Sequence, residues 1–334
     1  MKKKQISIKD IAKKANVSIA SVSRVISNKP GVGKETENRI REIMEEMNYR
    51  PNINARSLVK NNTGNIGLIV PGGSNTIHNS FFLTIIEGIS RVIEQTEYNL
   101  IISFTTKQHK KILDTNIVDG ILLLAPRENE IDLNWLKDLN LPIVIIGSFL
   151  ENSNFDCVSA DEISGVKLSV ESLYNKNHKH IALINGPSTS YQSKIYKQGY
   201  KNTIDELNLN EYILELQEFD IKGQETIVKT FLENNHDITG LVCSSDNIAL
   251  GILNIAKDLN INIPNQLSII GSDNTPVTNL VSPRLSTTNV DLKNIGETAI
   301  SRLFLKLNTK NTYRNINCIF PMDYIERETT ASLK

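Results

Sequence analysis

Apolar residues recur at helical spacing in three short segments of the first fifty residues. The positions expected to face inward are Ile8, Ile11, Ala12 and Ala15, then Val22, Val25 and Ile26, and then Ile40, Ile43, Met44 and Met47. This spacing predicts amphipathic helices over about 8–15 and 18–26 and from about residue 34 onward. The stretch NKPGVG, between the second and third segments, excludes helix there.

Beyond residue 64 the pattern changes to short apolar runs separated by amphipathic stretches. The runs are IGLIV at 66–70, followed by NLIIS, GILLLA, PIVIIG, HIALIN, ITGLVCS and LSIIGS. Between the first two lies FFLTIIEGISRVIEQT, residues 81–96, whose apolar positions fit one face of a helix. Two successive series of strands and helices predict two doubly wound parallel sheets, each with its ligand-binding edge where the strands end.

Length and composition indicate a soluble protein of two or three domains. The chain has 334 residues, of which 40% are hydrophobic and 22% charged. No apolar run approaches the roughly 20 residues of a membrane span, so no membrane partner is expected. No apolar segment follows the basic start MKKKQISIKD, so no signal peptide is expected. Cys157, Cys243 and Cys318 form no CxxC pair, which favours reduced thiols, no metal site and a cytoplasmic location.

The formal net charge of zero conceals an uneven distribution. Residues 1–60 hold 14 Lys and Arg against six Asp and Glu, whereas the remaining residues hold 23 against 31. A basic segment joined to an acidic body is typical of a module that binds a polyanion. The alternative is a basic solvated tail, and the helical periodicity of this segment argues against it.

The second predicted helix carries an unusual polar face. Ser18 can cap this helix, as Ser7 with Asp10 can cap the first. The outward positions are Ile19, Ala20, Ser21, Ser23 and Arg24. Two helices joined by a tight turn, with a third behind them, form a helix-turn-helix head, whose second helix enters the major groove and needs small side chains there. The isoleucine can contact a thymine methyl, the serines bases or phosphates, and the arginine a guanine or a phosphate.

The segment IKDIAKKANVSIASVSRVISNKPGVGKETENRIREIMEEMNYRPNINARSL, residues 8–58, closely resembles the signature of the lac/galactose repressor family. The resemblance implies that PNINARSL is a hinge helix, which forms on DNA and pairs with the hinge of a second subunit in the minor groove. Leu58 would wedge between base pairs and Ala55 would permit close approach; the alternative is that Leu58 merely ends a surface helix. Gly33 stands where the family usually has a capping Ser. The residues assigned to DNA contacts are Ser7, Ser18, Ile19, Ala20, Ser21, Ser23, Arg24, Asn28, Tyr49, Asn52, Ala55, Arg56 and Leu58.

The resemblance continues more diffusely over the rest of the chain and implies the two-lobed fold of periplasmic sugar-binding proteins. The expected organisation is a head with its hinge helix at 1–60, a linker at 61–64 and an effector-binding and dimerisation body at 65–334. The N-lobe is expected at about 65–160 plus 291–320, and the C-lobe at about 161–290 plus 321–334. The chain would cross between the lobes near Asp161, near 289–291 and near 320–322. The helix between residues 104 and 118 should be truncated, because this segment is shorter than is usual in the family.

For a ligand between the lobes, the family match points to polar and aromatic residues near strand ends. These are Phe81, Phe82, Asp161, Lys194, Tyr196, Phe219, Ser245, Asp246 and Asp273. Asp273 ends an apolar strand, where a carboxylate can accept hydrogen bonds from two vicinal sugar hydroxyls. Asp246 can equally be a helix cap, and one of the two phenylalanines is expected in the core. Tyr196 stands where the family usually has an effector-binding Arg, which favours a neutral sugar, although Lys194 can substitute.

The residues and the resemblance together imply a homodimeric transcriptional repressor without a cofactor. It would bind a pseudo-palindromic operator of a carbohydrate-utilisation operon, and a small sugar would release the DNA or, with the opposite sign, tighten binding. The hinge and the loop PGGSNTIHNSFF look most like those of maltose-operon repressors of low-GC Gram-positive bacteria.

Two alternatives belong to other classes. A small-metabolite enzyme is disfavoured because GxGxxG after a strand, the P-loop motif and HExxH are all missing, and because the five histidines do not cluster. His178 and His180 are instead expected at the surface. A sugar-binding protein without a DNA function is disfavoured by the head and hinge.

Overall fold

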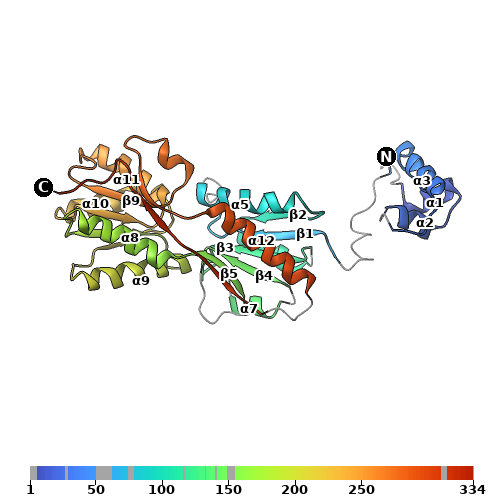
Figure 1. The fold of residues 1–334 in the computed structure, drawn as a ribbon, viewed down its shortest axis with the longest axis horizontal. Coiled ribbons are helices and arrows are strands. Elements are labelled where there is room, and N and C mark those ends of the chain that lie inside the picture. Colours follow the sequence, from blue (N-terminus) through green and yellow to red (C-terminus); the bar gives the residue numbers. More distant parts are fainter. Residues whose placement is uncertain are drawn as a thin grey trace. The chain divides into compact units, whose positions relative to one another are not determined.

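The computed structural model describes residues 6–26, 29–49, 62–73, 79–115, 117–131, 133–139, 141–148, 155–309 and 314–333 (Figure 1). The chain forms two compact units, Met1–Thr63 and Gly64–Lys334, so the division falls inside the predicted linker. We call the first unit the head and the second the body.

The head is a bundle of three helices, as the apolar spacing predicts. They are α1 (Ile8–Ala15), α2 (Ile19–Ile26) and α3 (Lys34–Glu46). Their apolar faces meet around Ile11, Val22 and Ile40, each 0% exposed. Asn16 takes the left-handed conformation at the end of α1, with φ 51°, and thereby makes the tight turn into α2. Gly33 is the N-cap of α3 and offers no side chain to cap it.

The N-lobe of the body is a six-stranded parallel sheet in the order β11-β5-β4-β3-β1-β2. Its strands are β1 (Asn65–Ile69), β2 (Asn99–Ser103), β3 (Gly120–Leu124), β4 (Ile143–Ile146), β5 (Asp156–Ala160) and β11 (Asn317–Phe320). One face is covered by α5 (Ser80–Ile93) and α12 (Leu292–Asn308), and the other by α6 (Thr106–Asp114) and α7 (Leu133–Lys137). In β3, Leu122 and Leu124 point to the first face and Ile121 and Leu123 to the second, because successive side chains alternate.

Two glycines allow α5 and α12 to lie against each other. A Cβ at Gly88 would overlap the carbonyl oxygen of Lys293, and one at Gly296 would overlap the carbonyl oxygen of Ile85. Only glycine permits this backbone contact, so the pair of helices depends on both positions. The helix expected to be truncated, α6, is nine residues long.

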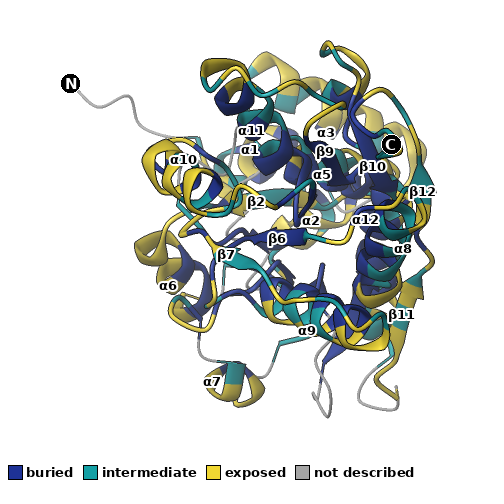
Figure 2. Cartoon of the chain, turned by 90° about the vertical axis from the view of Figure 1, so that its left-hand side faces the viewer, coloured by how far each residue is buried: buried dark blue, intermediate teal, exposed yellow. Residues whose placement is uncertain are grey.

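The C-lobe contains a second six-stranded sheet, in the order β12-β10-β9-β8-β6-β7. Its strands are β6 (Ile181–Asn185), β7 (Ile213–Glu215), β8 (Gly240–Cys243), β9 (Ser268–Asp273), β10 (Ser286–Asn289) and β12 (Asp323–Ile325). All pairs are parallel except β10 with β12. One face of this sheet is covered by α8 (Glu162–Asn175) and α9 (Tyr191–Glu206). The other face is covered by α10 (Glu225–Asn234) and α11 (Asp246–Asp258). A short 3-10 helix, η2 (Pro276–Asn279), follows β9. Figure 2 shows the buried strand β6 and the exposed outer surfaces of α6 and α10.

The chain changes lobe three times, between β5 and α8, between β10 and α12, and between β11 and β12. These are the three places that the sequence indicated. The predicted fold, a helix-turn-helix head with two doubly wound sheets, is confirmed. Among the described residues, no helix combines the length and the apolar character needed to cross a membrane.

The surface assignment of His178 is wrong. Its ring is 0% exposed, and its nitrogens lie 2.9 Å from Thr239 Oγ1 and 3.0 Å from the carbonyl oxygen of Ala331. This histidine therefore joins the C-terminal segment to the C-lobe core. Of the three thiols, Cys157 and Cys243 are buried and Cys318 is partly so.

Candidate functional sites

The outward face of α2 is slim and open. Ser18 Oγ accepts a hydrogen bond of 3.0 Å from the backbone N–H of Ser21 and so caps the helix. Val22 and Val25 are buried, while Ile19 is 46% exposed. Ala20, Ser23 and Arg24 are also exposed, and Ser21 is half-buried. The head core thus fixes a helix whose free side carries small side chains and one guanidinium group.

Three other head residues have defined surroundings. Asp10 accepts hydrogen bonds of 2.8 Å and 2.7 Å from the Ser7 backbone N–H and Oγ, which holds the start of α1. The Arg24 guanidinium group lies beside Gly31, where a Cβ would come 3.2 Å from Nη1. Tyr49 is half-buried against the head core, and burial raises the pKa of its hydroxyl above the usual value. The remaining predicted DNA contacts, Asn28, Asn52, Ala55, Arg56 and Leu58, lie outside the described residues.

Asp246 is held by hydroxyl and backbone donors at the end of the C-lobe sheet. Oδ2 accepts from the Thr275 backbone N–H (2.7 Å) and Oγ1 (2.8 Å), and Oδ1 accepts from Thr287 Oγ1 (2.7 Å). Burial raises its pKa to about 7, although these bonds and the Arg327 charge act in the opposite direction. Asp246 is not the cap of α11: that role belongs to Ser245, whose Oγ accepts from the Ile248 N–H at 3.2 Å.

Asp273 and Tyr196 lie close together at the same edge of the C-lobe. Asp273 ends β9 with φ 100°, a conformation that costs energy for a non-glycine residue. Burial, and then the charges of Asp246 and Glu162, raise the pKa of Asp273 well above its ordinary range. Tyr196 is 1% exposed, and its hydroxyl forms a hydrogen bond with Ser272 Oγ. Burial, followed by the charges of Glu162 and Asp273, raises the pKa of Tyr196 far above the usual value.

The other predicted effector residues of the C-lobe have structural roles. Asp161 caps α8, because its Oδ1 accepts from the Ser164 N–H at 3.2 Å. Phe219 packs so tightly on Gly186 that no Cβ would fit there, and its carbonyl oxygen accepts from Ser245 Oγ at 3.1 Å. Lys194 forms an ion pair of 2.6 Å with Glu128 of the N-lobe.

Phe81 and Phe82 both lie in the N-lobe core. They are 8% and 7% exposed, and their rings make a T-shaped contact at 5.3 Å between centroids. One of the two was expected in the core, and both are found there, because the first turn of α5 packs both rings into the N-lobe core. Stacking on a sugar would require one ring to leave the core.

A polar cavity of about 900 Å³ lies between the lobes. None of the nine predicted effector residues lines it. Its lining is Gly72, Gly73, Phe104, Thr105, Thr106, Arg127, Asn129, Glu130, Pro187, Ser188, Thr189, Glu215, Leu216, Gln217 and Glu218. The cavity is therefore formed by the segments that follow β1, β2 and β3 in one lobe and β6 and β7 in the other.

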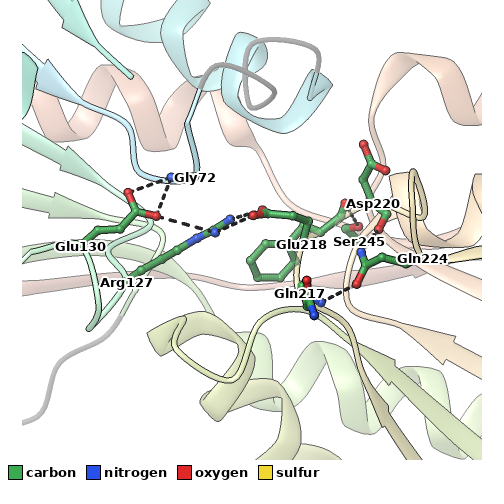
Figure 3. A network of polar contacts seen from close by, with 9 residues as sticks. Gly72, Arg127, Glu130, Gln217, Glu218, Asp220, Gln224 and Ser245 are labelled. Atoms are coloured by element: carbon green, nitrogen blue, oxygen red, sulfur yellow. Dashed lines mark hydrogen bonds and ion pairs between the residues drawn. The ribbon is translucent and has the colours of Figure 1, made fainter. Parts of the chain in front are cut away.

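Arg127 joins the two lobes across this cavity (Figure 3). Its Nη1 and Nη2 donate to the two carboxylate oxygens of Glu218 at 3.1 Å and 2.6 Å. On the N-lobe side, Glu130 lies 3.7 Å from Nη1 and accepts from the Gly72 backbone N–H at 2.9 Å. The adjacent backbone adds a hydrogen bond from the Glu128 N–H to the Thr189 carbonyl oxygen at 2.9 Å. Sequence reasoning missed Arg127, although a charged residue close behind the buried strand GILLLA, separated from it only by Pro126, was the available signal.

A helix-turn-helix head joined to a two-lobed body with a polar cleft defines a class of protein, the DNA-binding regulators that respond to a small ligand. Residues 7–52 match the family model of bacterial regulatory proteins, lacI family, and residues 170–330 match that of the periplasmic binding protein-like domain.

Whole-chain comparisons agree with this class. Catabolite control protein A of Priestia megaterium is 31% identical over 92% of this chain and 94% of its own. The ribose operon repressor of Halalkalibacterium halodurans is 29% identical over 97% of this chain and 96% of its own length. The fold is similar to that of the lac repressor dimer bound to operator and the anti-inducer ONPF, with a TM-score of 0.84, 20% identity, and coverage of 98% of this chain and 100% of that one. The chain belongs to the lacI family of bacterial regulatory proteins. It is a DNA-binding transcriptional regulator and not an enzyme.

Proposed function

We propose that the protein is a cytoplasmic repressor of a carbohydrate-utilisation operon. Two chains form a homodimer that binds a pseudo-palindromic operator, and a small sugar bound between the lobes changes the affinity for DNA. The observation that carries the proposal is the exposed face of α2, where small and hydroxylated side chains surround Arg24 on a helix fixed by the head core. Such a helix can approach base edges closely.

Most of the proposed DNA contacts fall into two groups, and Ser7, Asn28 and Tyr49 are proposed contacts outside both. The major-groove group is the exposed face of α2 with Ser18 at its start, in which Arg24 binds a guanine or a phosphate. The minor-groove group is Asn52, Ala55, Arg56 and Leu58, which rests on the family resemblance alone. A dimer would place two heads on half-sites about one helical turn apart or a multiple of it, so the operator is expected to mirror the two-fold symmetry.

The proposed effector site is the C-lobe edge around Asp273, Tyr196 and Asp246. Parallel sheets bind ligands at the carboxyl ends of their strands, and these residues lie there. The ribose operon repressor among the relatives supports a sugar as the effector. Maltose is one candidate, suggested by the resemblance of the hinge and of the loop after β1, which is described only in part. Release from DNA and retention on DNA are both consistent with this site.

The test is the thermodynamic coupling between effector and operator. Labelled duplexes recovered by selection from random DNA would be titrated with the full-length protein, with and without a panel of sugars, and followed by fluorescence anisotropy. One sugar is expected to change operator affinity about 5- to 150-fold, and the operator must change the affinity for that sugar by the same factor. A sugar that binds without altering operator affinity would contradict the proposal.

A further inference from the structure

Two segments that lie far apart in the sequence join the N-lobe to the C-lobe beside the polar cavity. One follows β3, and the other leads into α9. Arg127 of the first segment and Ser190 of the second lie opposite each other in an isolated antiparallel bridge. The Glu128 backbone N–H donates to the Thr189 carbonyl oxygen at 2.9 Å. The backbones of the two lobes therefore pair directly, as neighbouring antiparallel strands do.

Two ion pairs reinforce this backbone contact. The Arg127 guanidinium group donates to both carboxylate oxygens of Glu218, at 3.1 Å and 2.6 Å (Figure 3). On the same N-lobe segment, Glu128 forms a 2.6 Å ion pair with Lys194 of α9. Each pair thus has one partner in each lobe. We call the five residues that make these contacts, Arg127, Glu128, Thr189, Lys194 and Glu218, the clasp.

The clasp lies away from the covalent connections between the lobes. The three crossovers use β5 and β11 of the N-lobe and β10 and β12 of the C-lobe, which stand at one end of the strand order in each sheet. The clasp instead follows β3 in the N-lobe and β6 and β7 in the C-lobe, and these two are the last strands of the C-lobe order. Breaking the clasp would therefore leave the lobes joined only toward one edge, about which they can turn.

The two ion pairs of the clasp are partly open to water. The Arg127 side chain is 9% exposed, but its partner Glu218 is 48% exposed. In the second pair, Lys194 and Glu128 are 48% and 44% exposed. Such pairs are much weaker than fully buried ones, because water screens them and can replace either partner. The clasp can therefore favour one arrangement of the lobes without making it permanent.

Helix α9 connects the clasp to the proposed effector site. Lys194 and Tyr196 lie two residues apart on this helix, and the Tyr196 hydroxyl forms a hydrogen bond with Ser272, the neighbour of Asp273. A ligand that moves α9 at this edge would also move Lys194 and the segment before it. The clasp is thus attached to the helix that carries part of the proposed effector site.

We propose that the clasp holds the two lobes closed in the ligand-free protein, and that its opening is the movement that changes the affinity for the operator. The inference rests on the proposed function, because it treats the body as the regulator of DNA binding. An effector then acts through its different affinities for the closed and the open arrangement of the lobes.

Disulfide trapping tests whether the clasp is closed in solution. Opposite residues of paired antiparallel backbones lie within the reach of a disulfide, so Glu128→Cys with Thr189→Cys can be bridged. The contact between Arg127 and Glu218 stays intact in this double variant. Mild oxidation of the full-length protein without sugar should convert nearly all chains to the disulfide form, as counting of free thiols measures against the wild type. A folded double variant that forms no disulfide would overturn the proposal.

Adding Glu218→Gln to the two cysteines tests the regulatory role. The reduced triple variant has lost both ion pairs, whereas its oxidised form has the lobes joined covalently. Without sugar, the operator affinity of the reduced form should differ at least about fivefold from that of the wild type, as fluorescence anisotropy measures. Oxidation should restore the wild-type affinity. A reduced form with wild-type affinity, or a changed affinity that oxidation does not restore, would overturn the proposal.

The matched control is Lys201→Gln with Glu211→Gln. It removes a 2.9 Å ion pair within the C-lobe whose side chains are 40% and 48% exposed, and it should leave operator affinity unchanged. A control that changes operator affinity as much as the reduced triple variant does would overturn the proposal, because loss of any ion pair would then suffice. If selection from random DNA yields no operator, the proposed function fails, and disulfide trapping still decides whether the clasp is closed.

Discussion

Replacing Glu218 with glutamine removes half of a charge pair that joins the two lobes. Arg127 is 9% exposed and Glu218 is 48% exposed, and their contact is bidentate. Breaking a buried pair costs about 3–5 kcal/mol, whereas an exposed pair contributes about 0–1 kcal/mol. This pair is half-exposed on one side, and Glu130 remains 3.7 Å from the guanidinium group, so Arg127 is not left without a counter-charge. We therefore expect a loss of about 1–2 kcal/mol in the free energy of unfolding.

Urea unfolding of the full-length protein, followed by the fluorescence of the single tryptophan, Trp135, measures this loss. Glu215→Gln is the matched control, because Glu215 forms a 3.2 Å pair with Lys197 within the C-lobe and both side chains are more than a third exposed. That control should cost less than about 0.5 kcal/mol. If Glu218→Gln costs no more than the control, Arg127 does not hold the lobes together, and the role assigned to this contact fails.

Four further predictions follow from the head and the C-lobe. Arg24→Ala should weaken operator binding by about 1–3 kcal/mol and relax the preference at one base pair; equal weakening on every duplex would mean that Arg24 contacts only phosphate. Asp273→Asn, which tolerates the positive φ, should leave operator affinity intact and abolish the sugar response in the anisotropy assay; an unchanged response would refute the pocket. Gly33→Ser should stabilise the head by up to about 1 kcal/mol, because a serine at the N-cap of α3 can accept a hydrogen bond from the first turn. The backbone there has φ −65°, which suits serine, and an added Cβ meets no atom within 4 Å. Slower hydrogen exchange in α3 measures the effect. Burial is the main cause that raises the pKa of Glu162 from 4.5 to about 7 in the folded state, so the wild type loses stability as the pH rises through that window. The stability gained by Glu162→Gln should therefore grow between pH 5 and pH 8, by on the order of 1–3 kcal/mol. A gain that is constant with pH would contradict this assignment.

The elements that could be predicted from sequence are those whose own residues carry a strong apolar pattern. The helices of the head and strands such as GILLL and IALIN need no information beyond their hydrophobic spacing. Strand β10 has the sequence STTN and was missed, because its hydroxyl groups are satisfied by distant partners. Thr287 donates to Asp246, and Thr288 bonds to Ser272. Such tertiary hydrogen bonds leave no local signal in the sequence.

The candidate site was predictable in position more than in detail. Strand ends correctly indicated where Asp246 and Asp273 lie, but they could not show that Ser245 caps α11 or that Asp161 caps α8. The sequence also does not indicate that Glu162 is buried, since glutamate side chains are mostly exposed in folded proteins. These properties depend on how α8 and α9 pack on the sheet, which is decided by contacts far apart along the chain.

Selection of duplexes from random DNA by the full-length protein tests the central claim most directly. At moderate ionic strength we expect enrichment of one pseudo-palindromic sequence, bound at least about a thousandfold tighter than random duplex. Binding that is equally tight for all duplexes, both with and without candidate sugars, would contradict the account of α2 as a helix that recognises base pairs.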